Sequence, residues 1–384
     1  MERTTGTYRV STAGGEEVRA FVPHPLPPAD PPLVLDERLA ALLAEANAAV
    51  GRLAVASTMV ASAEWFLYGF VRKEAVVSSQ IEGTQATLGD VLEFEATARS
   101  DRPDDVQDVC NYVDALAYAR REMARPKGLP ISVRLLAQVH KRLMKGARGA
   151  DKQPGMIRRT QNWVGGTRPG NATYVPPPAD TLRDTLGRLD EWLHADDPLP
   201  ALVRTGLAHV QFESIHPFLD GNGRVGRLLV TLLVEHWKLL PHPLLYLSLA
   251  LKRHRREYYD LLTAVRVDGD WEGWIAFYLE CVREAADDAV AAAQALFRRV
   301  STDRRTMVAH RRATVNAIRL FDQLPAHPIL TLGRATRLLK TSKPTTLKAI
   351  DALERAGILR ETTGKRRDRV YAYHAYLRIL TRDT

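Results

Sequence analysis

Cysteine is scarce in this 384-residue chain, which contains only Cys110 and Cys281. Two cysteines cannot build the disulfide framework of a small secreted protein, and their scarcity fits a reducing compartment, so we expect a cytoplasmic protein. The first ten residues also lack a basic start followed by an apolar run, so we expect no signal peptide. No uncharged apolar stretch is long enough to cross a bilayer, so we expect no membrane partner.

Positive charge is unevenly distributed along the chain, whose formal net charge is +9. Residues 298–384 contain 20 Lys and Arg against 7 Asp and Glu, whereas residues 1–297 are slightly acidic. A strongly basic segment on a mildly acidic body favours a polyanionic partner for that segment. A solvated surface would have the same composition, so charge alone leaves both interpretations open.

Helical periodicity dominates the chain from residue 36 onward. The predicted helices cover 36–56, 64–77, 104–124, 131–145, 180–193, 199–214, 224–238, 252–265 and 271–323, and the last is long enough to require a bend. Prolines in the first 30 residues predict an extended arm. Residues 154–178, rich in glycine and β-prone side chains, predict a short hairpin or flap. Residues 325–384 read as two short helices followed by a hairpin with a basic turn, the order of a winged helix-turn-helix.

The stretch HPFLDGNGRVGR, residues 216–227, matches the dinucleotide pattern G-x-G-x-x-G. A Rossmann site would need a preceding strand and an acidic residue about 20 positions further on. Here the preceding segment is helical, and Glu235 comes too early. The P-loop pattern is absent as well, so the stretch is neither of these nucleotide sites.

The same stretch nevertheless has the chemistry of a phosphate site. Gly221 and Gly223 allow consecutive backbone N–H groups to converge at the start of a helix, where the helix dipole favours an anion. Arg224 and Arg227 are three residues apart and suit phosphate oxygens. Asp220 is placed to hold a hard cation such as Mg²⁺, and the imidazole of the preceding histidine can act as a base near neutral pH. This combination indicates nucleotidyl or phosphoryl transfer, whereas a zinc site built from His209, His216 and Asp220 matches no known ligand spacing.

The stretch resembles the Fic family signature H-P-F-x-[DE]-G-N-G-R-x-x-R at every fixed position. Residues 154–166 and 174–178 resemble the family's flap, and 256–262 resemble its helix on the nucleotide side. The resemblance implies a mainly α fold: a helical Fic-type core with a short β-hairpin flap, followed by a winged helix-turn-helix domain. We therefore expect an N-terminal arm and helices at 1–100, the Fic core at 101–297, and a linker helix with the winged-helix domain at 298–384.

The resemblance also implies transfer of AMP from ATP to a Tyr, Thr or Ser hydroxyl of a protein, with release of pyrophosphate and with self-modification as one outcome. His216 would be the base, Asp220 would hold Mg²⁺, and Phe218 would anchor the loop. The flap, at Thr173, Tyr174 and Val175, would pair with an extended target segment. The residues expected to bind ATP are Gly221, Asn222, Gly223, Arg224, Val225, Gly226, Arg227, Tyr258 and Tyr259; half-buried helix packing is the alternative for the two tyrosines.

A second short pattern, SSQIEGT at 78–84, follows the predicted helix 64–77. Ser78, Glu82 and Gly83 meet [ST]-x-x-x-E-[GN], which resembles the inhibitory motif found upstream of some Fic cores. The resemblance implies that Glu82 pairs with Arg227 and keeps this arginine from the γ-phosphate. An ordinary surface glutamate is the alternative interpretation.

Two other functions remain open from the sequence. In one, the chain is a transcriptional regulator in which the winged helix binds double-stranded DNA and the Fic core is a sensor. Its basic wing would contact phosphate through Lys365, Arg366, Arg367 and Arg369. In the other, the same catalytic site removes AMP, with Glu82 orienting water. The sequence leaves open the target protein and whether the chain forms a homodimer.

Overall fold

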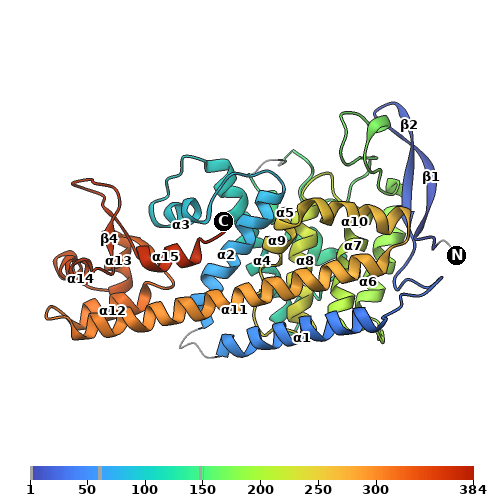
Figure 1. Cartoon of the computed structure of the whole chain (residues 1–384). Coiled ribbons are helices and arrows are strands. Elements are labelled where there is room, and N and C mark those ends of the chain that lie inside the picture. The colour runs from blue at the N-terminus through green and yellow to red at the C-terminus, as the bar shows by residue number, and fades with distance from the viewer. Residues whose placement is uncertain (1–2, 59–62, 147–148, 150) are drawn as a thin grey trace.

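The computed structural model describes residues 3–58, 63–146, 149 and 151–384, and it is mainly helical with small antiparallel sheets (Figure 1). In chain order the elements are β1 (Gly6–Ala13), β2 (Glu16–Pro23), α1 (Glu37–Thr58), α2 (Ala63–Ile81), α3 (Leu88–Thr97), α4 (Pro103–Ala124), α5 (Val133–Leu143), α6 (Leu182–His194), α7 (Ala201–Ile215), α8 (Asn222–His236), α9 (Leu247–Arg253), α10 (Arg255–Val267), α11 (Trp271–Ala309), α12 (Val315–Gln323), β3 (Ile329–Thr331), α13 (Leu332–Leu339), α14 (Lys343–Arg355), β4 (Arg360–Glu361), β5 (Val370–Ala372) and α15 (His374–Leu380).

Two helices, α7 and α8, form the centre of the helical body. Every residue from 202 to 215 in α7 except Arg204 is buried, as are residues 224–234 of α8. A helix that is buried on all sides must be enclosed by other helices. The 39-residue α11 packs against α7 and also against α1, α9 and α15. The six-residue connection between α7 and α8, residues 216–221, is therefore held between two immobilised helix ends.

The N-terminal segment is a β-hairpin, so the expected extended arm is wrong for residues 6–23. Strands β1 and β2 pair antiparallel with Gly6 opposite Pro23. The turn between them uses Gly14 and Gly15, both at positive φ, a conformation that glycine adopts without a steric penalty. The alternation of buried and exposed residues in β2 shows the period of two that favours a strand. The proline-rich stretch 24–35 is irregular.

The predicted helix over 271–323 is broken after Ala309. Helix α11 is continuous over its 39 residues, and the chain turns at 310–314 before α12 begins at Val315. Thr314 caps α12 by accepting a hydrogen bond from the backbone of Ala317, and such a cap favours a new helix over the continuation of the old one. The expected bend is thus a full break near the end of the segment.

The predicted flap over 154–178 contains a single β-bridge in place of a regular hairpin. Val164 and Tyr174 exchange two backbone hydrogen bonds of 2.8 and 3.1 Å. A short 3₁₀ turn at Pro169–Asn171 closes the loop between them. Proline and glycine interrupt the pairing on both sides, because proline lacks the N–H that a ladder requires.

The end of the chain, residues 315–384, forms what we call the C-terminal unit. It contains α12, α13 and α14, and a three-stranded antiparallel sheet in the order β3-β5-β4. The unit is joined to the helical body by α15, which packs on α11, and by β3, which lies beside α3. It occupies the end of the molecule opposite the β1–β2 hairpin (Figure 1).

Among the described helices, α1 alone is long and apolar enough to cross a membrane by length and composition. In the fold it lies along α11, with Leu39, Ala49 and Leu53 buried. An ion pair of 2.6 Å between Arg52 and Asp287 fixes it there. The same apolar stripe is what a helix needs to pack on a neighbouring helix.

Candidate active site

The loop between α7 and α8 is closed by its own side chains. Asn222 accepts a hydrogen bond from the backbone N–H of Phe218 (2.9 Å) and donates one to its carbonyl (2.8 Å). The Phe218 ring is 1% exposed and stacks on His140, with ring centroids 3.9 Å apart. As expected, Phe218 is packed into the core. The side chain of Asn222 is used inside the loop, which leaves its backbone N–H for a ligand.

His216 begins this loop in the left-handed conformation, with φ of 48°, directly after the last turn of α7. Burial, together with the positive charge of Arg158, lowers the pKa of His216 from 6.5 to about 4, against a backbone hydrogen bond at Glu213 that raises it. The imidazole is therefore neutral at physiological pH. A neutral imidazole is the form that can accept a proton.

Arg158 holds the loop from the flap side, a role that the sequence analysis did not assign to it. Its side chain donates to the carbonyls of His216 (3.0 Å) and Pro177 (2.5 Å). Its backbone N–H donates to the carbonyl of Pro217 (3.0 Å). It is 1% exposed and forms no ion pair among the described residues. Burial lowers its pKa to about 10, so it stays charged. Only the arginine fork supplies several fixed donors from one side chain.

Replacing Arg158 by lysine should lower the free energy of unfolding by about 2–4 kcal/mol, because each buried carbonyl left without a donor costs about 1–3 kcal/mol. Urea denaturation followed by circular dichroism measures this loss. The neighbouring Arg159 is exposed, and Arg159→Lys is the matched control. Equal denaturation midpoints for the two variants would show that Arg158 does not support the loop.

His140 on α5 holds the other side of the loop. Its Nδ1 accepts from the backbone N–H of Gly155 (2.8 Å), so its Nε2 carries the proton and donates to the carbonyl of Asp220 (3.0 Å). Burial lowers the pKa of His140 to about 4, which keeps this tautomer neutral. The carboxylate of Asp220 accepts from the N–H of Gly221 (2.6 Å) and remains partly exposed. The sequence analysis missed His140 as well.

Helix α8 begins directly after Gly221, which is at φ of 76°. The N–H groups of Asn222, Gly223 and Arg224 lie in the first turn, where a helix has no internal acceptors for them. Val225 already donates to the carbonyl of Gly221 (3.1 Å). The expected anion cradle is therefore limited to the N–H groups at 222–224.

The other two expected ATP ligands on α8, Val225 and Gly226, face the protein interior. Val225 is fully buried, and a Cβ on Gly226 would collide with the carboxylate of Glu213 on α7. Glycine at this position lets α7 and α8 approach closely. Both residues are placed for packing between these helices.

The two arginines of α8 are both paired with acids. Arg224 lies 3.4 Å from the carboxylate of Asp108 on α4, and both side chains are almost fully buried. Arg227 donates to the hydroxyl (2.9 Å) and to the carbonyl (2.9 Å) of Ser78, and to Glu82 (2.6 Å). The structure thus brings together the expected partners, Glu82 and Arg227, which are 145 positions apart in the sequence.

Glu82 lies in the turn after α2, with its carboxylate against the start of α8. A Cβ on Gly223 would collide with Glu82 Oε1, so the carboxylate occupies space directly over the first helical turn. Burial raises the pKa of Glu82, but the charge and hydrogen bond of Arg227 together with the charge of Arg224 outweigh burial and hold this pKa below its usual value. The negative charge of Glu82 in turn raises the pKa of Arg227. At neutral pH both groups are charged, and the carboxylate takes the place that the helix start offers to an anion.

The two tyrosines of α10 differ in accessibility. Tyr258 is 1% exposed and its hydroxyl lies 2.9 Å from Nε2 of His209, inside the core. Tyr259 is 40% exposed, and its ring lies 5.0 Å from that of Tyr258. Only Tyr259 presents a ring surface that a ligand can reach.

The flap residues are held by the N-terminal hairpin. The N–H of Phe21 in β2 donates to the carbonyl of Val175 (2.9 Å), and the hydroxyl of Tyr174 donates to the carbonyl of Ser214 in α7. Tyr174 is 9% exposed, whereas Thr173 next to it is exposed. Part of the backbone edge that was expected to pair with a target is thus already paired within this chain.

Comparison with known proteins agrees with this arrangement. Residues 40–121 match the Fic/DOC family N-terminal domain, and residues 130–234 match the Fic/DOC family domain. The protein adenylyltransferase Fic of Culex quinquefasciatus is 28% identical over 212 residues, which are 54% of this chain and 39% of that protein. That of Drosophila grimshawi is 28% identical over 265 residues, 66% of this chain and 47% of that protein. The chain thus spans less than half the length of these relatives.

Two solved structures show the same fold. A Fic family protein from Desulfovibrio desulfuricans G20 superposes with a TM-score of 0.58 at 22% identity, over 89% of this chain and 98% of that chain. Fic-1 of C. elegans, residues 134–508, gives a TM-score of 0.51 at 20% identity, over 67% of this chain and 74% of that chain. The two matching domains contain α2 with its glutamate turn and the loop between α7 and α8. The chain thus contains a Fic/DOC family N-terminal domain and a Fic/DOC family domain.

Proposed function

We propose that this chain is a protein adenylyltransferase that transfers AMP from ATP to a hydroxyl side chain of a protein, itself included, and that Glu82 restrains it. The observation that carries the proposal is the neutral His216 beside a helix start whose arginine is held by Glu82. The relatives named protein adenylyltransferase support the same chemistry. The bound ATP would place its phosphates on the N–H groups at 222–224.

In the proposed reaction the hydroxyl oxygen of the target attacks the α-phosphorus of ATP. The bond from this phosphorus to the bridging oxygen breaks, and pyrophosphate leaves. His216 accepts the hydroxyl proton, which its lowered pKa permits at neutral pH. Arg158 and His140 keep the loop in place during the reaction, so that the base and the anion cradle stay aligned.

Mg²⁺ is the cation that a polyphosphate site of this kind requires, and the residues present fit it. The described residues contain no cluster of three or more acidic, His or Cys side chains that would hold a metal by themselves. Mg²⁺ suits such a site because it is commonly bound by one or two carboxylates, with water and phosphate oxygens as its other ligands. Asp220, partly exposed at the loop, would supply the carboxylate. When bound, the ion would neutralise phosphate charge.

The direct test is a mass spectrum of the full chain after incubation with ATP and Mg²⁺. The expected result is an added mass of one AMP on a Tyr, Thr or Ser, with pyrophosphate in solution. Release of AMP from a previously modified chain, without any addition, would instead assign the site to AMP removal. No AMP added in the first assay and no AMP released in the second would contradict the proposal.

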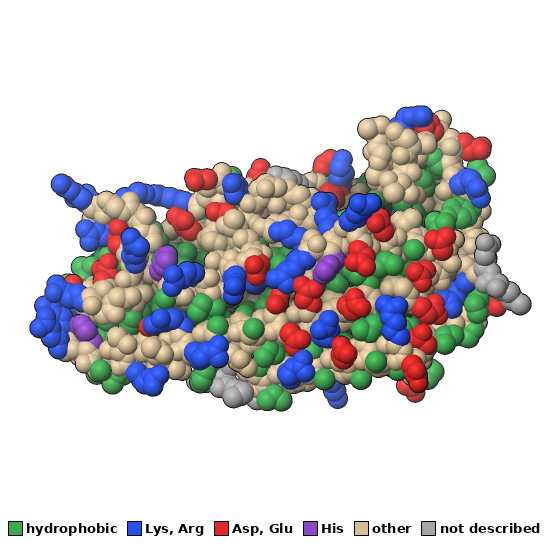
Figure 2. All heavy atoms as spheres, viewed as in Figure 1, with side chains coloured by type: hydrophobic (Ala, Val, Ile, Leu, Met, Phe, Trp, Pro, Cys, Tyr) green, Lys and Arg blue, Asp and Glu red, His purple; other side chains and the backbone are tan. Residues whose placement is uncertain are grey.

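A second proposed function concerns the C-terminal unit, which we infer to be a winged helix that binds double-stranded DNA. The order α12, β3, α13, α14, β4, β5 and the exposed loop between β4 and β5 support this inference. Lys365, Arg366 and Arg367 are exposed in that loop, whereas Arg369 donates to the carbonyl of Lys365. Figure 2 shows Lys and Arg side chains gathered at this end of the molecule. Helix α14 would enter the major groove.

The full chain should bind a labelled duplex with an affinity that falls at least about tenfold between about 50 and 200 mM salt, because bound phosphates release counterions. Fluorescence anisotropy measures this dependence. Replacing Lys365, Arg366 and Arg367 by glutamine should lower the affinity and make the salt slope shallower. Retention of the duplex by this variant at every salt concentration would contradict a role for the wing.

A further inference from the structure

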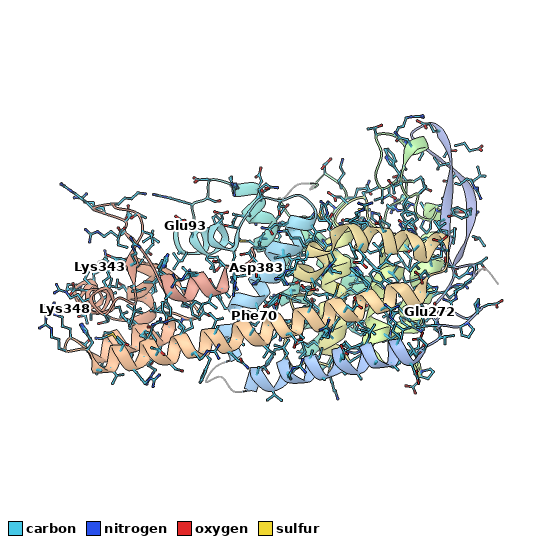
Figure 3. The ribbon with its side chains drawn as sticks, in the orientation of Figure 1. Phe70, Glu93, Glu272, Lys343, Lys348 and Asp383 are labelled. Atoms are coloured by element: carbon cyan, nitrogen blue, oxygen red, sulfur yellow. The ribbon has the colours of Figure 1, made fainter. Side chains whose placement is uncertain are left out.

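A groove runs between the C-terminal unit and the N-terminal helices. It has a volume of about 770 Å³ and lies between α3, the starts of α13 and α14, and the loop that joins β4 to β5. Its basic lining residues are Arg99, Lys343, Lys365, Arg366, Arg367 and Arg369, against Glu93 and Asp368 as its acidic ones. Figure 3 shows Glu93 and Lys343 on the two sides, on α3 and on α14.

We propose that this groove binds the phosphate backbone of double-stranded DNA, and that α3 and Arg99 form part of the DNA interface. The inference rests on the proposed DNA binding by the C-terminal unit and extends it to a second part of the chain. The occupant would lie along α14 and the wing, and Arg99 would contact the backbone from the opposite wall.

Among the described residues, the cations of the groove form no ion pair with an acidic side chain. Arg99, Lys343, Lys365, Arg366 and Arg367 form no ion pair in this part of the chain, and Arg369 is turned back on its own loop. Exposed arginines elsewhere do have partners, such as Arg304 with Asp322 at 3.2 Å. Uncompensated cations gathered along one groove repel one another and are neutralised by a polyanion.

The two walls of the groove are held together by a partly buried junction. Arg334 of α13 donates to the backbone carbonyl of Glu95 in α3 (2.7 Å) and lies 3.0 Å from His327. The carboxylate of Glu95 accepts in turn from Arg72 of α2 (2.9 Å) and from Tyr68. Because α3 is fixed to both α2 and the C-terminal unit, the backbone that carries Arg99, two residues after α3, is held beside the C-terminal unit.

The apolar side chain in the groove favours duplex DNA over an acidic protein segment. Leu347 on α14 is 45% exposed and lines the groove one helical turn after Lys343. An α-helix fits the major groove, where apolar side chains contact the thymine methyl group and cations contact the flanking phosphates. Exposed lysines alone would bind any polyanion. Leu347 and Lys343 on one face of α14 would instead contact a base edge and the neighbouring phosphate of a duplex.

The test measures binding of a labelled duplex to the full chain at several salt concentrations. Arg99→Gln should weaken binding about threefold or more. It should also reduce the slope of the logarithm of the binding constant against the logarithm of the salt concentration by about one, the value for one lost phosphate contact. Arg183→Gln is the matched control, because Arg183 is an exposed arginine on α6, distant from the C-terminal unit (Figure 1). The control should bind as the parent does. AMP incorporation, measured on the same samples, should be unchanged in both variants.

Three outcomes would overturn the proposal, and they are distinguishable. If the wing variant loses the duplex while Arg99→Gln matches the control, the C-terminal unit binds DNA but α3 is no part of the interface. If the parent binds poly-glutamate as tightly as the duplex at equal salt, the groove is an acidic-protein site. If the parent binds no duplex, DNA binding by the C-terminal unit fails too, while AMP transfer stands on its own measurement.

Discussion

Replacing His216 by alanine should lower AMP transfer by about 10²–10⁴-fold, the usual effect of removing a general base. The loss should fall on the chemical step, because the side chain acts on the incoming hydroxyl and the phosphates rest on backbone N–H groups of α8. ATP affinity should therefore stay close to that of the parent. Incorporation of radiolabelled AMP and equilibrium binding of ATP measure the two quantities separately.

The structure adds a control to this experiment. His140 is likewise neutral at physiological pH, but it is buried and both of its ring nitrogens are engaged, with the carbonyl of Asp220 and with the N–H of Gly155. His140→Ala should lower stability as well as rate, because it leaves that carbonyl and the Gly155 N–H without partners. His216→Ala should leave the thermal midpoint nearly unchanged. Undiminished self-modification in His216→Ala would show that the base lies elsewhere.

The loop between α7 and α8 could be read from sequence because its chemistry is local. A glycine at positive φ, a helix start and two arginines all fall within twelve residues, so backbone rules and side-chain chemistry suffice. The pairing of Glu82 with Arg227 came from a resemblance of motifs, and the structure places the two groups 2.6 Å apart. Neither motif encodes that distance on its own.

The supports of the loop could not be read in the same way. Arg158 lies in a polar, proline-flanked segment where an arginine is ordinarily exposed, and two of its four carbonyl partners, His216 and Pro217, belong to the loop after α7. Asp108 pairs with Arg224 across 116 positions on a helix whose pattern suggests only an acidic surface. Contacts between residues so far apart in the sequence depend on how the helices pack. Hydrophobic periodicity predicts where helices form but not how they pack against one another.

Helix α3 and the β1–β2 hairpin were not predicted, for a different reason. Helix α3 has ten residues, and its start is set by the capping box between Thr87 and Asp90 more than by an apolar stripe. The β1–β2 hairpin was hidden by the prolines that follow it, which suggested an extended arm for the whole segment. Both elements matter for function here, because α3 forms a wall of the basic groove and β2 holds the flap at Val175.

Glu82→Gly should raise the rate of AMP transfer, an unusual direction for the loss of a residue at an active site. The carboxylate now holds Arg227 and lies against the first turn of α8, the place proposed for the phosphates. Its removal frees the guanidinium for the γ-phosphate and clears the helix start for an anion. The α-phosphorus can then lie in line with the attacking hydroxyl, and correct placement is worth on the order of 10²-fold in rate.

Loss of the ion pair should not unfold the chain. Residue 82 lies in the turn after α2, so glycine there breaks no helix, and Arg227 keeps both hydrogen bonds to Ser78. Glu82 is 36% exposed, so water screens part of the pair and its contribution to stability is modest. The thermal midpoint of Glu82→Gly, measured without nucleotide, should therefore lie near that of the parent.

The arginine partner tests whether the gain comes from this contact. Arg227→Ala should be less active than the parent, and the double variant Glu82→Gly with Arg227→Ala should show no gain over Arg227→Ala alone, because the freed group is missing. AMP incorporation is measured for all four forms at one ATP concentration. Equal or lower activity in Glu82→Gly would remove the restraining role and leave Glu82 as a surface charge or as a participant in AMP removal. A gain that persists in the double variant would instead assign the restraint to the carboxylate over α8, independent of Arg227.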